Sequence, residues 1–205
     1  LEARPPADLP AHATVELGTR LEHEHERALE ALTAEDVVAM ATRDLAQAAE
    51  RTADWTFERD DFAGLEPSLR RIYHRGRKRM RTARADPNAE NLHDCHKRVK
   101  DLWHVAQLLH PADPKRMKRL SRRAHELADV LGDHHDLSVL RDYVEVHPHH
   151  FEDEPTRDAL LAAIDRRREV LGRRALKRGG DIYKRRPKRF VADIERGWRK
   201  RVQAG

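Results

Sequence analysis

Apolar residues recur along the chain at spacings of three and four, the period of an α-helix with one buried face. The clearest seam lies between residues 91 and 110 and consists of Leu92, Cys95, Val99, Leu102, Ala106 and Leu109. A second seam lies between residues 65 and 85 and consists of Leu65, Leu69, Ile72, Gly76 and Met80. Both segments are therefore expected to be amphipathic helices that pack their apolar faces into a core.

The rest of the pattern predicts further helices joined by short connections. The expected helices cover residues 14–32, 33–55, 65–85, 91–110, a fifth segment ending at Gly132, 133–146, 156–178 and 181–202. Thr33 and Asp133 are the expected N-caps, Gly132 ends a helix, and Pro187 interrupts the last one. Short connections favour antiparallel neighbours. The expected fold is therefore all-α, an antiparallel bundle of long helices.

The composition agrees with a helical protein that stays inside the cell. Charged residues make up 38% of the 205 residues, aromatic residues 5%, and there are only 9 glycines. The single cysteine, Cys95, lies on an apolar seam and is expected to be buried and reduced. Neither a signal peptide nor an apolar run long enough for a membrane span is recognisable, so we expect a cytoplasmic protein without a membrane anchor.

Three regions are expected along the chain. Residues 1–13 contain three prolines and are predicted to be an irregular leader. Residues 14–64 are predicted to form a helical hairpin, and residues 65–205 a larger helical bundle.

Charge is distributed unevenly along these regions. The net charge of +5 is too small to identify a polyanion-binding protein. However, residues 69–84 contain eight arginines and lysines and no carboxylate, whereas residues 16–61 are rich in Glu and Asp. The face opposite the seam of 91–110 carries His93, His96, Lys97, Lys100 and His104. Because like charges at this spacing repel, such a row is most simply explained by a bound anion or by acidic neighbours elsewhere in the fold.

Two consecutive basic helices can line a shared groove for a chain of phosphates. Arginine binds phosphate oxygens through a bidentate fork, and lysine acts as a compact charge. Histidines would make the binding stronger as the pH falls. The pattern therefore predicts a polyanion groove along residues 65–85 and 91–110.

Four segments agree with one known family. The first two are His93-x-x-His96-Lys97-x-x-Lys100-x-Leu102-Trp103 and Leu131-Gly132-x-x-His135-Asp136-Leu137-x-Val139-Leu140. The other two are the basic segments 69–77 and 183–190. Together they resemble the CHAD domain, the conserved histidine α-helical domain, mainly its second half, over roughly residues 65–198. The resemblance implies a helical bundle that binds inorganic polyphosphate and can associate with polyphosphate granules.

The chain departs from the family pattern in two ways. Family members usually carry Arg where this chain has His96, which implies that one phosphate contact is pH-dependent here. The family also contains an earlier, similar repeat, and no counterpart of it is recognisable before residue 65. The chain is therefore expected to be a partial CHAD domain, with 14–64 as the remainder of the preceding bundle.

The resemblance and the charge pattern together predict a non-catalytic polyphosphate-binding protein without a cofactor or metal ion. Its expected contacts to phosphate oxygens are His93, Lys97, Lys100, Arg70, Arg71, Arg75, Arg77, Lys78, His96, His104, Arg119, Arg123 and Lys188. The oligomeric state does not follow from the sequence.

Three alternatives remain open. His135-Asp136, with His93 or His125 upstream and Asp165 or Asp193 downstream, resembles the order of an HD-type metal phosphohydrolase, although the surrounding Arg and Lys would repel a metal ion. Asp136 is expected instead to cap a helix or to pair with an arginine. A nucleic-acid-binding protein is the second alternative, since a phosphate groove would also bind RNA or DNA at low salt. A structural adaptor is the third.

Overall fold

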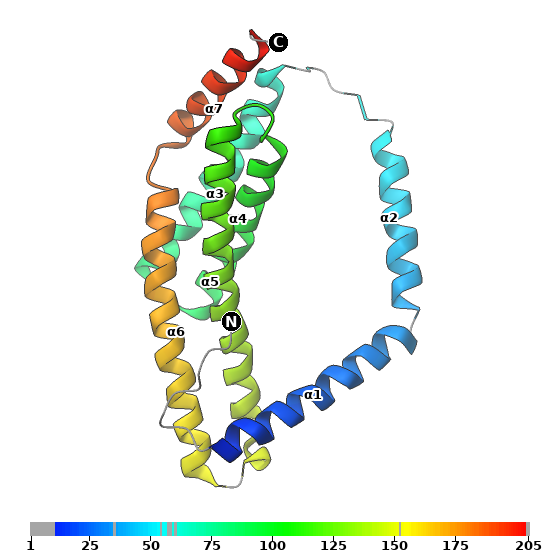
Figure 1. The fold of residues 1–205 in the computed structure, drawn as a ribbon, viewed down its shortest axis with the longest axis vertical. Helices are drawn as coiled ribbons and strands as arrows, with labels where there is room; N and C mark the ends of the chain where they lie inside the picture. Colours follow the sequence, from blue (N-terminus) through cyan, green and yellow to red (C-terminus); the bar gives the residue numbers. More distant parts are fainter. Residues whose placement is uncertain are drawn as a thin grey trace. The chain divides into compact units, whose positions relative to one another are not determined.

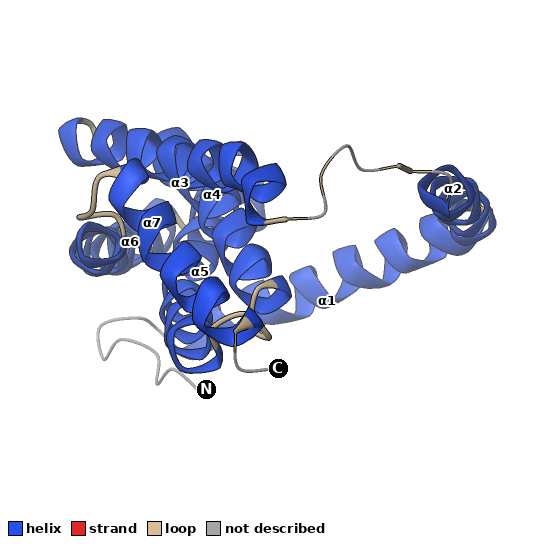
Figure 2. Cartoon of the chain, turned by 90° about the horizontal axis from the view of Figure 1, so that it is seen from above, coloured by secondary structure: helices blue, strands red, loops and turns tan. Residues whose placement is uncertain are grey.

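The computed structural model describes residues 11–34, 36–53, 55–56, 59, 61–151 and 153–203 (Figure 1). The described residues form helices and no strand (Figure 2): α1 (Ala11–Ala34), α2 (Val37–Ala53), α3 (Phe62–Ala85), α4 (Ala89–Leu108), α5 (Pro114–Val146), a 3-10 turn (Pro148–His150), α6 (Glu154–Ile182) and α7 (Pro187–Val202). The all-α prediction is thus confirmed. The expected leader lies outside the described residues up to position 10, and α1 already includes positions 11–13.

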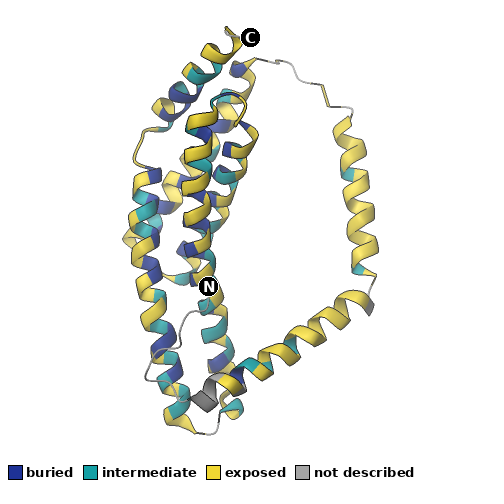
Figure 3. Ribbon diagram, viewed as in Figure 1, coloured by how far each residue is buried: buried dark blue, intermediate teal, exposed yellow. Residues whose placement is uncertain are grey.

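The chain divides into two compact units, which are described separately. The first contains the described residues of 1–58 together with 151–160, and the second contains 59–150 together with 161–205. In the first unit α2 has no buried residue (Figure 3). Thr33 does not cap a second helix, because it lies within α1 and its hydroxyl donates to the carbonyl oxygens of Leu29 and Glu30. Asp36, with a φ of 52°, separates α1 from α2.

The second unit is built on the predicted apolar seams. All six seam residues of 91–110 are buried: five lie within α4, Cys95 among them, and Leu109 is its C-cap. In α3 the buried residues are Phe62, Leu69, Tyr73, Gly76, Met80 and Ala83. Leu65 was predicted to face inward but is 38% exposed, whereas Phe62, the first residue of the helix, is buried and packs against Trp198 with ring centroids 5.9 Å apart. Short loops join α3 to α4 and α4 to α5, and these consecutive helices pack against each other.

Two helices are longer than predicted, and each continues through glycines near its expected end. α5 continues through Gly132 and Asp133, so neither residue marks a helix boundary. α6 continues through Gly179 and Gly180 to Ile182 and only then gives way to α7, whose first residue is Pro187. At Gly179 the missing side chain allows a close approach between helices, whereas at Gly132 an added Cβ would make only an ordinary contact. A Cβ at Gly179 would lie 2.6 Å from the Met80 sulfur, and one at Gly132 would lie 3.6 Å from His96 Cε1.

Contacts from α5 and α3 hold the last two helices. α6 lies along α5, where Arg178 Nη1 is 3.2 Å from Glu126 Oε2 and Arg141 Nε donates to Asp165 over 3.0 Å. α7 packs on α3 through Phe190, whose ring stacks on Tyr73 at 3.9 Å. None of the described helices combines the length and apolar character required to span a membrane.

Candidate functional site: a basic pocket between α3 and the α6–α7 connection

The N-cap and the buried face of α3 fix the position of this helix. Asp61 caps its N-terminus by accepting a hydrogen bond from the Gly64 backbone N–H, and the buried seam holds one side of the helix against the core. The basic residues of α3 must therefore lie on its remaining surface. Five of them lie at successive helical spacings: His74, Arg77, Lys78, Arg81 and Arg84.

The end of α6 closes this surface into a pocket. Gly76 has no side chain to hold Tyr183 away, since an added Cβ would lie 2.5 Å from Tyr183 Cε1. Tyr73, a buried residue of α3, donates a hydrogen bond from its hydroxyl to the Ile182 carbonyl over 2.9 Å. Gly180 likewise leaves room for the Arg84 guanidinium. The α6–α7 connection therefore lies directly on α3.

The resulting pocket has a volume of about 270 Å³, and every ionisable residue in its lining except Tyr183 is basic. Its lining residues are His74, Arg77, Lys78, Met80, Arg81, Arg84, Gly180, Tyr183 and Lys184. Within the described part of the chain, no carboxylate pairs with any of its arginines or lysines. Such concentrated, unneutralised positive charge favours an anion.

Two of these arginines are fixed by backbone carbonyls rather than by acids. Arg77 Nε donates to the Tyr183 carbonyl over 3.2 Å, and Arg84 Nη2 donates to the Leu176 carbonyl over 3.0 Å. A carbonyl orients a guanidinium without cancelling its charge, and the remaining N–H groups can still bind phosphate oxygens. The pocket is thus partly preorganised for a phosphate group.

Lys184 also borders a second pocket, of about 220 Å³, next to α5. This pocket contains the predicted residues Arg119 and Arg123, and it is partly neutralised. Arg123 lies 3.9 Å from Asp181, and the buried Asp193 pairs with Arg116, Arg185 and Arg196. The two pockets together form a basic surface that continues across Lys184, with its stronger net charge on the α3 side.

Of the predicted residues of α4, His93 and His96 face α5, whereas Lys97 is close to Asp94, which pairs with Arg79 of α3. The His93 ring stacks on His135 with centroids 4.1 Å apart, and Lys97 Nζ lies 3.5 Å from Asp94 Oδ1. His96 and Lys100 line a pocket of about 380 Å³ whose other polar residues include Asp129, Asp133 and Asp136. The α4 row is therefore surrounded by mixed charge. The acidic neighbours that were considered as one explanation for this row are present.

Burial affects the α4 histidines. Desolvation lowers the pKa of His93, and the neighbouring His135 and Lys97 lower it further. The pKa of His96 is lowered by desolvation and by Lys100. Both imidazoles therefore gain a proton at a lower pH than an unperturbed histidine does.

The other predicted residues are dispersed over the second unit. Arg70 pairs with Glu66, and Arg71 donates to the Ser68 hydroxyl. Arg75 and Lys188 are exposed, and His104 stacks on Trp103. The structure thus brings Arg77 and Lys78 together with four basic residues that were absent from the prediction: His74, Arg81, Arg84 and Lys184. Helical spacing from Arg77 could have identified Arg81 and Arg84, whereas Lys184 depends on the tertiary packing of the α6–α7 connection.

The residues of the HD alternative do not form a metal centre. Asp165 is bound by Arg141 and Arg168, and Asp193 is surrounded by three arginines. Asp136 lies within α5, so it does not cap a helix. Among the described residues, no group of three or more His, Cys, Asp or Glu side chains could hold a metal ion.

The family model for the CHAD domain matches residues 1–145, more than half of the chain. The chain therefore belongs to the CHAD family, whose domains are generally associated with polyphosphate binding. The match includes residues 1–64, which the motif resemblance had left out, and it ends before the expected closing segment 183–190. No curated protein and no solved structure matches the chain.

Proposed function

We propose that this protein binds inorganic polyphosphate without hydrolysing it, and that the pocket between α3 and the α6–α7 connection is its main contact. The observation that carries the proposal is a pocket with six basic residues and no carboxylate in its lining. Membership of the CHAD family supports the same ligand. A phosphate chain supplies repeated charge and needs neither an apolar cavity nor a metal ion.

The chain of phosphates would continue from this pocket across Lys184 towards Arg119 and Arg123. The predicted residues of α4 would contribute more weakly, because Lys97 is already close to Asp94 and the pKa values of His93 and His96 are lowered. The expected locations are the cytoplasm and polyphosphate granules.

Titration calorimetry with long-chain polyphosphate at near-physiological salt tests this proposal. The samples should also contain single-stranded RNA of matched charge as a competitor, and released phosphate should be assayed in parallel. We expect tight binding that RNA displaces poorly, without phosphate release. Weak binding of polyphosphate would contradict the proposal, and released phosphate would support the hydrolase alternative.

A further inference from the structure

A second basic surface lies at the end of the α4–α5 hairpin. It surrounds a pocket of about 810 Å³ that has no carboxylate in its lining. Its basic lining residues are His110, Lys115, Lys118, Arg119, Arg122 and His125. Arg122 lies 3.9 Å from Glu126, whereas Lys115, Lys118 and Arg119 have no ion pair among the described residues. This pocket shares none of its lining residues with the one between α3 and the α6–α7 connection, and it shares only Arg119 with the pocket next to α5.

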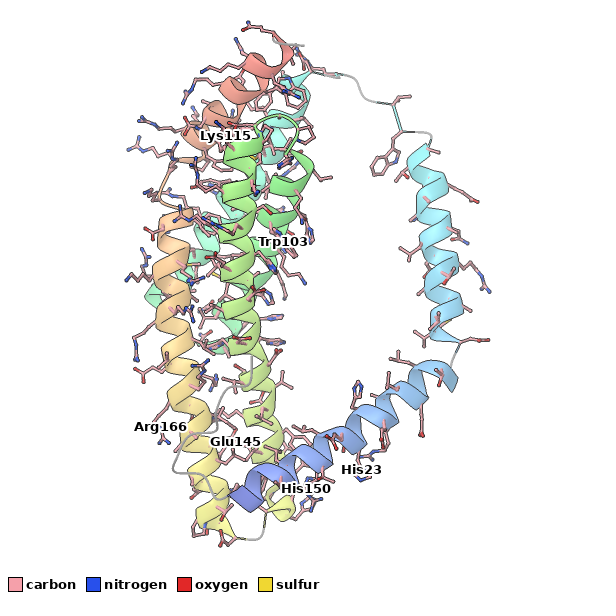
Figure 4. The ribbon with its side chains drawn as sticks, viewed as in Figure 1. His23, Trp103, Lys115, Glu145, His150 and Arg166 are labelled. Carbon is pink, nitrogen blue, oxygen red and sulfur yellow. The ribbon has the colours of Figure 1, made fainter. Side chains whose placement is uncertain are left out.

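Three aromatic rings stack beside this surface. The Trp103 indole lies parallel to the His125 imidazole, with centroids 4.5 Å apart and an interplanar angle of 2°. On the same indole, the His104 ring stacks at 5.0 Å and 25°. Trp103 is anchored against the core, while both histidines are exposed. Asp129 Oδ1 lies 3.2 Å from His125 Nδ1 and helps to hold the His125 imidazole in place. Trp103 and Lys115 are labelled in Figure 4.

We propose that this surface binds single-stranded nucleic acid. Bases would stack on the exposed imidazoles that Trp103 supports, while Lys115 and Lys118 hold the adjoining phosphates. Stacking on flat rings beside a basic track is the usual mode of sequence-tolerant single-strand binding. The strand must be single because the base faces of a duplex are already stacked on one another.

The aromatic rings distinguish this ligand from polyphosphate. A polyphosphate chain has no flat group, so the stacked rings would add nothing to its affinity. Trp103 and His125 also line the neighbouring pocket, which contains the carboxylates Asp129, Asp133 and Asp136. They would repel a phosphate backbone there, which leaves the Lys115 and Lys118 side for the strand.

The test compares a fluorescently labelled oligodeoxyadenylate with an abasic oligonucleotide of the same length, using the full chain. The two probes carry the same phosphates and differ only in their bases. We expect the wild-type protein to bind the oligodeoxyadenylate about tenfold more tightly, the effect of stacking one base. Equal affinities would overturn the proposal and leave a site for phosphate alone.

Three double variants locate the effect. His104→Ala with His125→Ala should abolish the difference between the probes and preserve binding of the abasic one. Lys115→Glu with Lys118→Glu should weaken both probes by about tenfold or more. Lys78→Glu with Arg81→Glu changes the pocket between α3 and the α6–α7 connection. This variant should still prefer the oligodeoxyadenylate to the abasic probe by the same factor. The test of nucleic-acid binding therefore does not depend on the polyphosphate proposal. A preference that persists in the double histidine variant, with unchanged helicity and melting temperature, would also overturn the proposal.

Discussion

At Gly76 the absence of a side chain decides how α3 meets the end of α6. The Tyr183 ring occupies the space that a Cβ would need, and Tyr183 in turn lines the basic pocket. Burial raises the pKa of the Tyr183 hydroxyl well above its ordinary value, which agrees with a neutral, packed phenol. The sequence places Gly76 on the inward face of its helix. It cannot identify the ring that fills the space, because that contact joins residues more than a hundred positions apart.

Gly76→Ala should therefore destabilise the protein by about 1–3 kcal/mol, since a buried ring beside well-packed backbone cannot move freely. The matched control is Gly132→Ala, also within a helix, where an added Cβ would make an ordinary contact of 3.6 Å with His96. This control should be neutral, or stabilising by up to about 1 kcal/mol through helix propensity. Urea unfolding followed by circular dichroism measures both effects. Equal stability of the two variants would show that the Tyr183 contact is not tight.

Buried histidines should make stability depend on pH. Burial lowers the pKa values of His93, His96 and His134 below the ordinary 6.5, so the unfolded chain binds more protons than the folded chain below that pH. The free energy of unfolding should then fall as the pH decreases through 6.5 towards the folded pKa values. Urea unfolding at several pH values measures this slope.

The control for this pH effect is the double variant His96→Gln with His134→Gln. It removes two of the three titrating groups, so its stability should change less with pH between about 7.5 and 5.5. The comparison uses the slope rather than the absolute stability, because glutamine in place of the buried His134 can itself destabilise the fold. An unchanged slope would assign the pH dependence to other groups.

Within single helices, the hydrophobic pattern predicted the existence of elements well and their ends less well. The α4 seam is buried throughout because six apolar positions at one period leave little choice of face. The expected ends at Gly132 and at residues 178–181 were wrong, since α5 continues through Gly132 and α6 continues through Gly179 and Gly180, which leave room for Met80 and Arg84. A glycine needed for packing and a glycine that ends a helix look alike in one sequence.

The α4 row also shows why a row of cations does not by itself define a site. Lys97 is close to Asp94, which also pairs with Arg79 of α3. We therefore expect Lys97→Glu with Lys100→Glu to weaken polyphosphate binding by only about threefold, through the general loss of positive charge. Titration calorimetry against wild type at fixed salt measures this. Complete loss of binding, with helicity unchanged, would place the principal contact on α4 instead.

The two units of the whole molecule differ in how their helices are buried. α2 has no buried residue, whereas α4 contributes five to the core of the second unit. Local opening of a helix costs little when few apolar contacts must be broken. The charge pattern in the sequence separated an acidic N-terminal region from a basic one. The difference in burial depends on which faces find partners, and one sequence does not contain that information directly.

Backbone amides of α2 should therefore exchange with deuterium much faster than those of α4. Hydrogen exchange followed by mass spectrometry, with peptides from residues 37–53 and 89–108, makes the comparison within one sample. The free energy of opening calculated from exchange of the α4 amides should approach the free energy of global unfolding. Comparable protection in α2 would mean that this helix is packed in solution against a partner.

The central claim concerns the pocket between α3 and the α6–α7 connection. The most direct measurement is the affinity for long-chain polyphosphate of Lys78→Glu with Arg81→Glu, compared with Arg166→Glu with Arg167→Glu as a control of equal charge change. Arg166, labelled in Figure 4, and Arg167 are exposed residues of α6 that line none of the three basic pockets. The account predicts a loss of about tenfold or more for the pocket variant and a much smaller loss for the control, with the same helicity in both. Equal losses would contradict it, because the protein would then respond to net charge alone.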